Sequence, residues 1–132
     1  MALGRWASRT TYDDLPADVI EATKLRVLDV IGLSLAGAET AFGRSVREAA
    51  TAMSPHGPCH IVGTGDPVGV TAAAFVNGSF SQAMEYDDTH NESIVHMSSP
   101  SVAAALALSE MGRVSGRELI TAIASGNEIS CR

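Results

Sequence analysis

Apolar residues recur at three- and four-residue intervals in the first third of the chain. This spacing marks one face of a helix, and its members are Val19, Ile20, Thr23, Val27, Ile31 and Leu35. Pro16 suits a first helical turn, and Gly37 is a typical helix stop. The pattern therefore predicts a long amphipathic helix over residues 15–37, with this stripe facing the core.

Two more helices are predicted in the middle of the chain. The first covers residues 43–53 and ends at the Ser-Pro-His-Gly-Pro run of residues 54–58, which is typical of a turn. Residues 59–62 then form at most one very short extended segment. The second helix, from residue 70 to about residue 87, is rich in Ala and apolar on most of its circumference, which indicates burial on several sides.

The last third of the chain predicts two further helices. Ser99 is a suitable N-cap for a helix that Pro100 opens and that runs to Gly112. Ser115 and Glu118 have the spacing of a capping box, which marks another helix start. No stop signal follows before residue 132, so we expect an incomplete domain. The predicted fold is all-α, a bundle of about five helices.

Composition and charge narrow the class of protein. Hydrophobic residues make up 45% of the 132, mostly aliphatic, which fits one soluble domain. The formal net charge is −6, and no Lys or Arg lies between Arg47 and Arg113. We therefore expect no nucleic-acid partner. Two cysteines, no signal-peptide core and no membrane-length apolar run predict a cytoplasmic protein without a membrane span.

Candidate chemistry is concentrated in residues 85–96, which hold four carboxylates and two imidazoles. A polar row on the preceding apolar helix leads to this segment at four-residue spacing, through Asn77, Ser81, Glu85 and Thr89. Polar side chains on a buried helix need polar partners or water. One interpretation is that they only bond to neighbouring helices while the carboxylates solvate the helix end. The other is a functional site.

Asp87 and Asp88 favour the second interpretation. At the predicted C-terminal end of a helix, carboxylates are disfavoured by the helix dipole, so both need a compensating partner or a task. His96 precedes Ser98 and Ser99, where the next helix starts and offers free backbone N–H groups. Such an end can hold a carboxylate, and a histidine beside it can transfer a proton near neutral pH. A purely structural role for a lone histidine is the alternative.

Metal-dependent chemistry on a diphosphate is a third possibility. Asp87, Asp88 and Glu92 form a D-D-x-x-x-E pattern that suits Mg²⁺, with His90 and His96 as softer ligands nearby. A diphosphate also needs several basic side chains, and this region has none. We therefore predict no metal.

Three blocks of the sequence, in order, resemble the MmgE/PrpD family. They are YDDLPADVIEATKLRVLDVIGLSLAGAE, AAAFVNGSFSQAMEYDDTHNESIVHMSSPSVAAALALSE and GRVSGRELITAIASGNEISCR. The family includes 2-methylcitrate dehydratases, cis-aconitate decarboxylases and iminodisuccinate epimerases. The resemblance implies that residues 1–132 are the N-terminal part of a large helical domain, that later helices and an α/β lid domain are absent, and that no metal or organic cofactor is used.

The resemblance also implies roles for individual residues. The expected catalytic residues are His96, Thr89 and Glu85, with His96 contacting substrate or moving a proton. The expected substrate-binding set shares the same segment and its surroundings, and consists of Asp87, Asp88, His90, Ser98, Ser99 and Asn77. The substrate class implied is a small polycarboxylic acid.

Three positions depart from the usual family pattern. Gln82 stands where a histidine is usual, Glu85 where an aspartate is usual, and Met97 where a proline follows the histidine. The longer Glu85 side chain displaces the carboxylate by about one bond length. Polycarboxylate binding also needs cations that this region does not supply. We therefore expect a homo-oligomer or a complementary chain to complete the site.

Two functional hypotheses follow. The leading one is a fragment or subunit of a cofactor-independent lyase that dehydrates or decarboxylates small polycarboxylic acids and is inactive alone. The alternative is a non-catalytic helical binding or assembly module derived from the same fold.

Overall fold

The computed structural model describes residues 2–132 and contains six α-helices, one 3₁₀ turn and one hairpin. The helices are α1 (Ala2–Ala7), α2 (Ala17–Ala38), α3 (Ala41–Met53), α4 (Val70–Gln82), α5 (Ser98–Ser109) and α6 (Gly116–Ser130), and the 3₁₀ turn is η1 (Tyr12–Asp14). The antiparallel hairpin pairs β1 (Cys59–His60) with β2 (Pro67–Val68). The predicted all-α class with one very short extended segment is confirmed.

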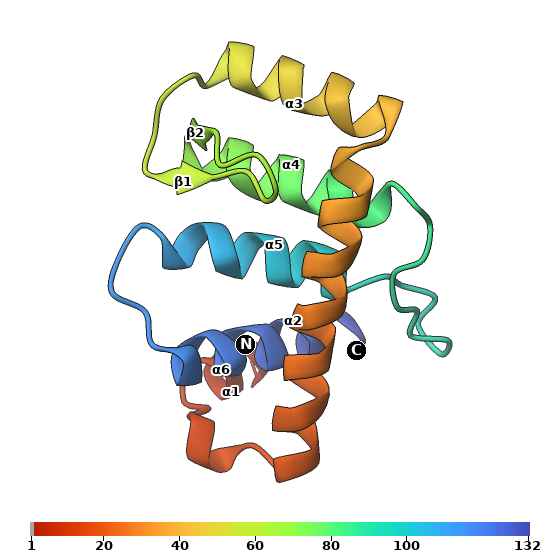
Figure 1. The fold of residues 1–132 in the computed structure, drawn as a ribbon. Coiled ribbons are helices and arrows are strands. Elements are labelled where there is room, and N and C mark those ends of the chain that lie inside the picture. Colours follow the sequence, from red (N-terminus) through yellow and green to blue (C-terminus); the bar gives the residue numbers. More distant parts are fainter. Residues whose placement is uncertain (1) are drawn as a thin grey trace.

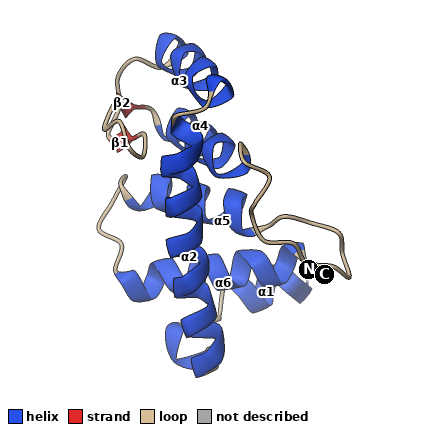
Figure 2. Cartoon of the chain, turned by 45° about the vertical axis from the view of Figure 1, so that its right-hand side comes forward, coloured by secondary structure: helices blue, strands red, loops and turns tan. Residues whose placement is uncertain are grey.

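Four helices form a stack, and the longest helix crosses it. Figure 1 shows α3, α4, α5 and α6 one above another in chain order, with α2 running lengthwise across them. The contacts agree, since α4 packs against α2, α3 and α5, while α6 packs against α2 and α5. Figure 2 shows the hairpin beside α4 and the long loop of residues 83–97 on another side. α4 is thus the most enclosed helix, as its apolar circumference predicted.

Gly37 was expected to end the long helix, and this prediction was wrong. The residue is buried inside α2, which continues to Ala38. A Cβ atom at position 37 would lie 1.9 Å from the carbonyl oxygen of Phe80 on α4. The glycine is therefore required by the close approach of two helix backbones rather than by a turn.

The buried stripe of α2 also differs from the predicted one. Thr23 is buried as predicted, but Val19 and Leu35 are exposed. Val30 and Ser34, which lie outside the predicted stripe, are buried. Ser34 satisfies its hydroxyl with the carbonyl oxygens of Val30 (2.7 Å) and Asn77 (3.3 Å). Because α2 packs its small and β-branched residues against α4, α5 and α6, its large leucines remain outside.

Two buried clusters make up the core. The larger lies between the hairpin, α3, α4 and α5, and contains Ala50, Cys59, Ile61, Val68, Ala73, Val76, Phe80 and Ala107. The smaller joins α2, α5 and α6 through Val30, Val102 and Ile123. Both depend on small and aliphatic side chains, as the composition predicted.

Helix boundaries were predicted unequally well. The capping box at the start of α6 is confirmed, because Ser115 Oγ accepts from the Glu118 N–H and Glu118 accepts from the Ser115 N–H. α4 ends at Gln82 instead of about residue 87, and Glu85 follows with a left-handed φ of 55°. α5 ends at Ser109, three residues before the predicted end, and α6 ends at Ser130.

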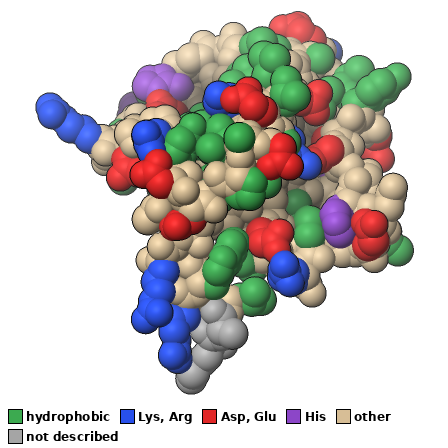
Figure 3. Space-filling model, turned by 90° about the horizontal axis from the view of Figure 1, so that it is seen from below, with side chains coloured by type: hydrophobic (Ala, Val, Ile, Leu, Met, Phe, Trp, Pro, Cys, Tyr) green, Lys and Arg blue, Asp and Glu red, His purple; other side chains and the backbone are tan. Residues whose placement is uncertain are grey.

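The face of the molecule seen from below carries side chains of every type. Figure 3, a view from below, shows basic, acidic and apolar side chains interspersed on that face. Within residues 2–132, none of the helices combines the length and the hydropathy needed to cross a bilayer.

Candidate functional site

The loop of residues 83–97 folds back so that two of its carboxylates reach the N-terminal end of α5. Asp87 accepts from Ser99 Oγ (3.0 Å) and from Gln82 Nε2 (3.1 Å). Asp88 accepts from the backbone N–H (3.3 Å) and the Oγ (2.6 Å) of Ser98. Negative charge is favourable at this end of a helix.

These contacts change the interpretation of Asp87 and Asp88. The sequence placed them at the C-terminal end of a helix, but α4 has already ended, and they anchor the next helix instead. The helix N-terminus that was expected to hold a substrate carboxylate therefore already receives two carboxylates of the chain itself. Ser98 and Ser99 are both buried beneath them.

His96 is paired with the buried carboxylate. Its Nδ1 lies 3.4 Å from Asp87 Oδ1, and the Asp87 side chain is fully buried whereas that of His96 is 45% exposed. The imidazole thus lies beside a buried carboxylate and is itself partly open to solvent.

A hollow of about 780 Å³ lies in front of this pair, and we call it the His96 hollow. α4 forms its long wall, which includes the exposed ring of Phe75, and Phe42 of α3 also lines the hollow. The polar end consists of Gln82, Glu85, His96 and Ser99. Among the described residues, no Lys or Arg lines this hollow.

Thr89 does not share a hollow with His96. It is exposed and lines a smaller hollow of about 280 Å³ together with Asp88, His90 and Arg26. Arg26 comes from α2, and its Nε lies 3.2 Å from Asp88 Oδ2. The sequence analysis missed this cation because 62 positions separate Arg26 from Asp88, and no local pattern links them.

Two other candidate residues are occupied by structural contacts. The Asn77 side chain is buried and holds the segment after β1, accepting from the Val62 N–H (2.9 Å) and donating to the His60 carbonyl (3.1 Å). His90 lies within a small turn, where its Nδ1 is 2.6 Å from Ser93 Oγ. Asn77 is therefore separated from the His96 hollow, against the expectation that it packs into one site with the loop.

The side chains considered as metal ligands also contact other residues of the chain. Asp87 and Asp88 bond to consecutive serines, and Glu92 lies 3.4 Å from His90 Nε2. Within the described chain, no three His, Cys, Asp or Glu side chains converge as a metal site would require. The D-D-x-x-x-E pattern thus does not correspond to a cluster of ligands.

Known proteins with similar sequences are fungal. The chain is 38% identical to the cis-aconitate decarboxylase of Aspergillus terreus, over 93% of this chain and 26% of that protein. It is 33% identical to the cis-aconitate decarboxylase-like protein oryM of Aspergillus oryzae, over 98% of this chain and 28% of that protein. The chain spans about a quarter of the length of these relatives. No solved structure is significantly similar to it.

The family assignment rests on the full length of the chain. The model of the MmgE/PrpD N-terminal domain matches residues 1–132. The three blocks of resemblance in the sequence lie within this match, in the same order. The chain therefore belongs to the MmgE/PrpD family.

Proposed function

We propose that this chain forms the histidine side of a cofactor-independent lyase site for small polycarboxylic acids. The observation that carries the proposal is His96, which lies beside the buried Asp87 at the polar end of a hollow large enough for such a substrate. The printed names of both relatives, a decarboxylase and a decarboxylase-like protein, point to the same class of chemistry.

His96 would act as the acid–base group. In a dehydration, it takes the proton from the carbon next to a substrate carboxylate, the carbon–carbon double bond forms, and the hydroxyl on the neighbouring carbon leaves as water with a proton donated by a second acid–base group. In a decarboxylation, the electron pair of the broken carbon–carbon bond remains on the substrate as CO₂ departs, and protonated His96 delivers a proton to that carbon. Glu85, exposed in the same hollow, is the second group placed to exchange a proton.

The His96 hollow lacks the cations that a polycarboxylate needs. Carboxylates are recognised mainly through charge-assisted hydrogen bonds from Arg or Lys. Glu85 and Asp87 instead add negative charge at the polar end of the hollow. We therefore propose that the isolated chain is inactive and that a complementary chain supplies the positive charge.

The test compares the isolated chain with a completed assembly. Purified chain is incubated with cis-aconitate and with 2-methylcitrate, and the conjugated alkene is followed by its ultraviolet absorbance. We expect no turnover by the chain alone and turnover once the completing polypeptide is added. Turnover by the isolated chain would overturn the proposed incompleteness.

The role of His96 is tested in the active assembly. His96→Gln should lower kcat by at least about a hundredfold, the usual contribution of a general acid–base group. His56→Gln is the matched control, because His56 is exposed and lies outside the hollow. Equal activity of the two variants would refute the assignment.

The second candidate function, an assembly module, is favoured by the outer face of α2. Leu25 and Leu28 on this face are 66% and 67% exposed, and Leu35 is 49% exposed. Exposed leucines gathered on one helix face are typical of a surface that another protein covers. Sedimentation equilibrium distinguishes the two candidates, since an assembly module self-associates through this face and Leu28→Gln weakens that association. A monomer at all concentrations speaks against the module.

A further inference from the structure

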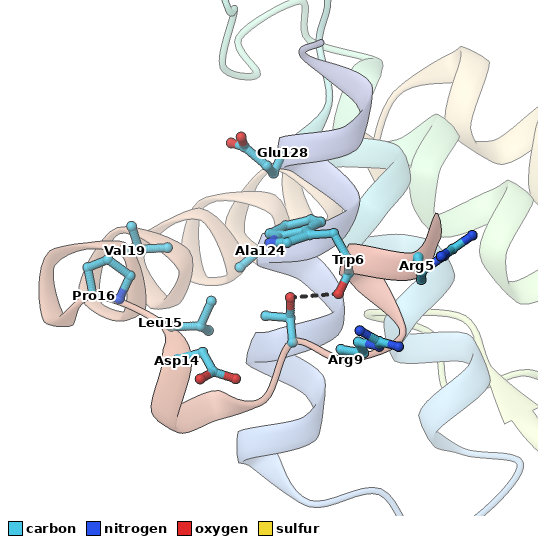
Figure 4. Close-up of a pocket in the computed structure, with 10 residues that line it drawn as sticks. Arg5, Trp6, Arg9, Asp14, Leu15, Pro16, Val19, Ala124 and Glu128 are labelled. Atoms are coloured by element: carbon cyan, nitrogen blue, oxygen red, sulfur yellow. Dashed lines mark hydrogen bonds between the residues drawn. The ribbon is translucent and has the colours of Figure 1, made fainter. Parts of the chain in front are cut away.

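The largest hollow of the described chain lies away from His96, beneath the N-terminal segment. It has a volume of about 890 Å³, within the range of small-molecule sites. Figure 4 shows Trp6 of α1 lying against Ala124 of α6, opposite Leu15, Pro16 and Val19 at the start of α2. We call this space the arm hollow, and the segment of residues 2–15 the arm.

Several contacts hold the arm in place. Thr10 closes the end of α1, because its N–H and its Oγ1 both donate to the Trp6 carbonyl at 3.0 Å. Arg117 of α6 pairs with Asp13 and lies 4.2 Å above the ring of Tyr12. The arm hollow is therefore formed in the folded chain before any ligand arrives, and this lowers the entropic cost of binding.

In the arm hollow the acidic side chains have bonding partners, whereas the basic side chains have no ion-pair partner among the described residues. Its two acidic groups have partners, since Asp14 accepts from the N–H and Oγ1 of Thr11 (2.9 and 2.7 Å) and Glu128 pairs with Arg132. Arg5 and Arg9 have no ion-pair partner among residues 2–132. Both arginines line the hollow and lie on the same side of it in Figure 4. Two guanidinium groups are thus available in a protein whose net charge is −6.

Trp6 adds a planar surface and a further donor. Its residue is 41% exposed, which leaves much of a large apolar ring open to solvent. In the described chain its indole N–H donates no hydrogen bond. An exposed aromatic ring flanked by unpaired arginines favours a ligand that is both flat or apolar and negatively charged.

We propose that the arm hollow binds an organic anion, a carboxylate or phosphate carried on a planar or apolar body. The anionic group pairs with Arg5 and Arg9, and the body lies on Trp6 and the aliphatic wall of Leu15 and Val19. This site is separate from the His96 hollow and does not depend on the proposed lyase function, so either can fail without the other.

The single tryptophan makes a direct test possible. Uniformly ¹⁵N-labelled chain is titrated with 2-naphthoate, with naphthyl phosphate and with the neutral isostere 2-naphthamide, and the indole N–H cross-peak is followed. Both anions should shift this peak saturably, and the amide should bind more weakly. The tighter of the two anions identifies the carboxylate or the phosphate as the natural group.

Substitutions separate charge recognition from simple adsorption to an apolar surface. Arg5→Gln and Arg9→Gln should each weaken naphthoate binding by about fivefold, as loss of one partly exposed charge-assisted contact predicts. Arg113→Gln is the matched control, because Arg113 is exposed and lies outside the hollow. Equal affinity for naphthoate and naphthamide, or unchanged affinity in both arginine variants, would overturn the proposal.

Discussion

The two hollows differ in the charged groups that line them and in how the chain builds them. The described residues that line the His96 hollow include a histidine and one carboxylate, Glu85, but no Lys or Arg, and the loop beside it is held by buried contacts to α4 and α5. The arm hollow has two unpaired arginines, and its arm is pinned by exposed contacts to α6. If both proposals hold, proton transfer takes place beside the buried Asp87, and anion binding takes place at the N-terminal arm.

If this distinction holds, the largest effect comes from the contact between α2 and α4, the helix that forms the wall of the His96 hollow. Gly37→Ala puts a Cβ atom 1.9 Å from the Phe80 carbonyl oxygen, so α2 and α4 must separate. We expect the free energy of unfolding to fall by about 3 kcal/mol, measured by urea denaturation. Gly32→Ala is the matched control on the same helix, with nothing within 4 Å of the new Cβ, and it should be neutral or slightly stabilising. Equal stability of the two variants would contradict the close packing.

Asp87→Asn should disturb the His96 hollow and leave the arm hollow unchanged. It removes the buried anion that accepts from Ser99 and Gln82 and faces His96. We expect the free energy of unfolding to fall by about 2 kcal/mol, which is the usual contribution of a hydrogen bond to a charged group. Glu85→Gln, an exposed change in the same loop, is the control. The Trp6 cross-peak and naphthoate affinity should not change, and a loss of both would show that the two hollows are coupled.

The sequence predicted contacts between residues that are close along the chain better than contacts between residues that are far apart along it. The capping box of Ser115 and Glu118 spans three positions, so its residues alone determine it. Gly37 was misassigned because its reason, the approach of Phe80, lies on another helix. The same holds for Arg26 and Asp88, which no local pattern connects. The pairing between distant segments was not predictable. Local chemistry predicted the capping box of α6 correctly, but the expected N-cap Ser99 was wrong, because α5 begins at Ser98 and Met97 precedes it.

The prediction that the polar row on α4 continues to Glu85 was wrong for a related reason. Asn77 and Ser81 lie on the helix and are buried, but Glu85 follows its end with a left-handed φ and does not extend the row. Without a glycine, proline or cap near residue 83, helical periodicity gave no sign of this ending. His96 and Asp87 were both named as site residues, yet their pairing appears only once the loop folds back onto α5.

A smaller effect on stability is expected at the start of α6, the helix to which the arm is attached through Arg117 and Asp13. Ser115→Ala removes the N-cap hydroxyl that accepts from the Glu118 N–H, and should cost about 1 kcal/mol. Because Arg117 lies in the first turn of α6 and pins Asp13, fraying of this turn should also weaken naphthoate binding in the arm hollow. Ser109→Ala, at the end of α5, is the control. Weakened binding with unchanged His96 resonances would confirm that only the periphery is loosened.

The smallest expected effect is a dependence of stability on pH, caused by Glu118 in the same capping box. Hydrogen bonds from the backbone and side chain of Ser115 lower the pKa of Glu118 below its ordinary value. A carboxyl whose pKa is lower in the folded state stabilises the fold above its unfolded pKa, and this contribution is lost as pH falls through the folded pKa. Glu118→Gln should therefore flatten the acid limb of a stability-against-pH curve, measured by urea denaturation between about pH 3 and pH 6. Glu48→Gln, an exposed change on α3, should leave that limb in place. If both variants give the same curve as the parent chain, the capping carboxylate does not contribute to stability, and the attachment of the arm rests on Arg117 alone.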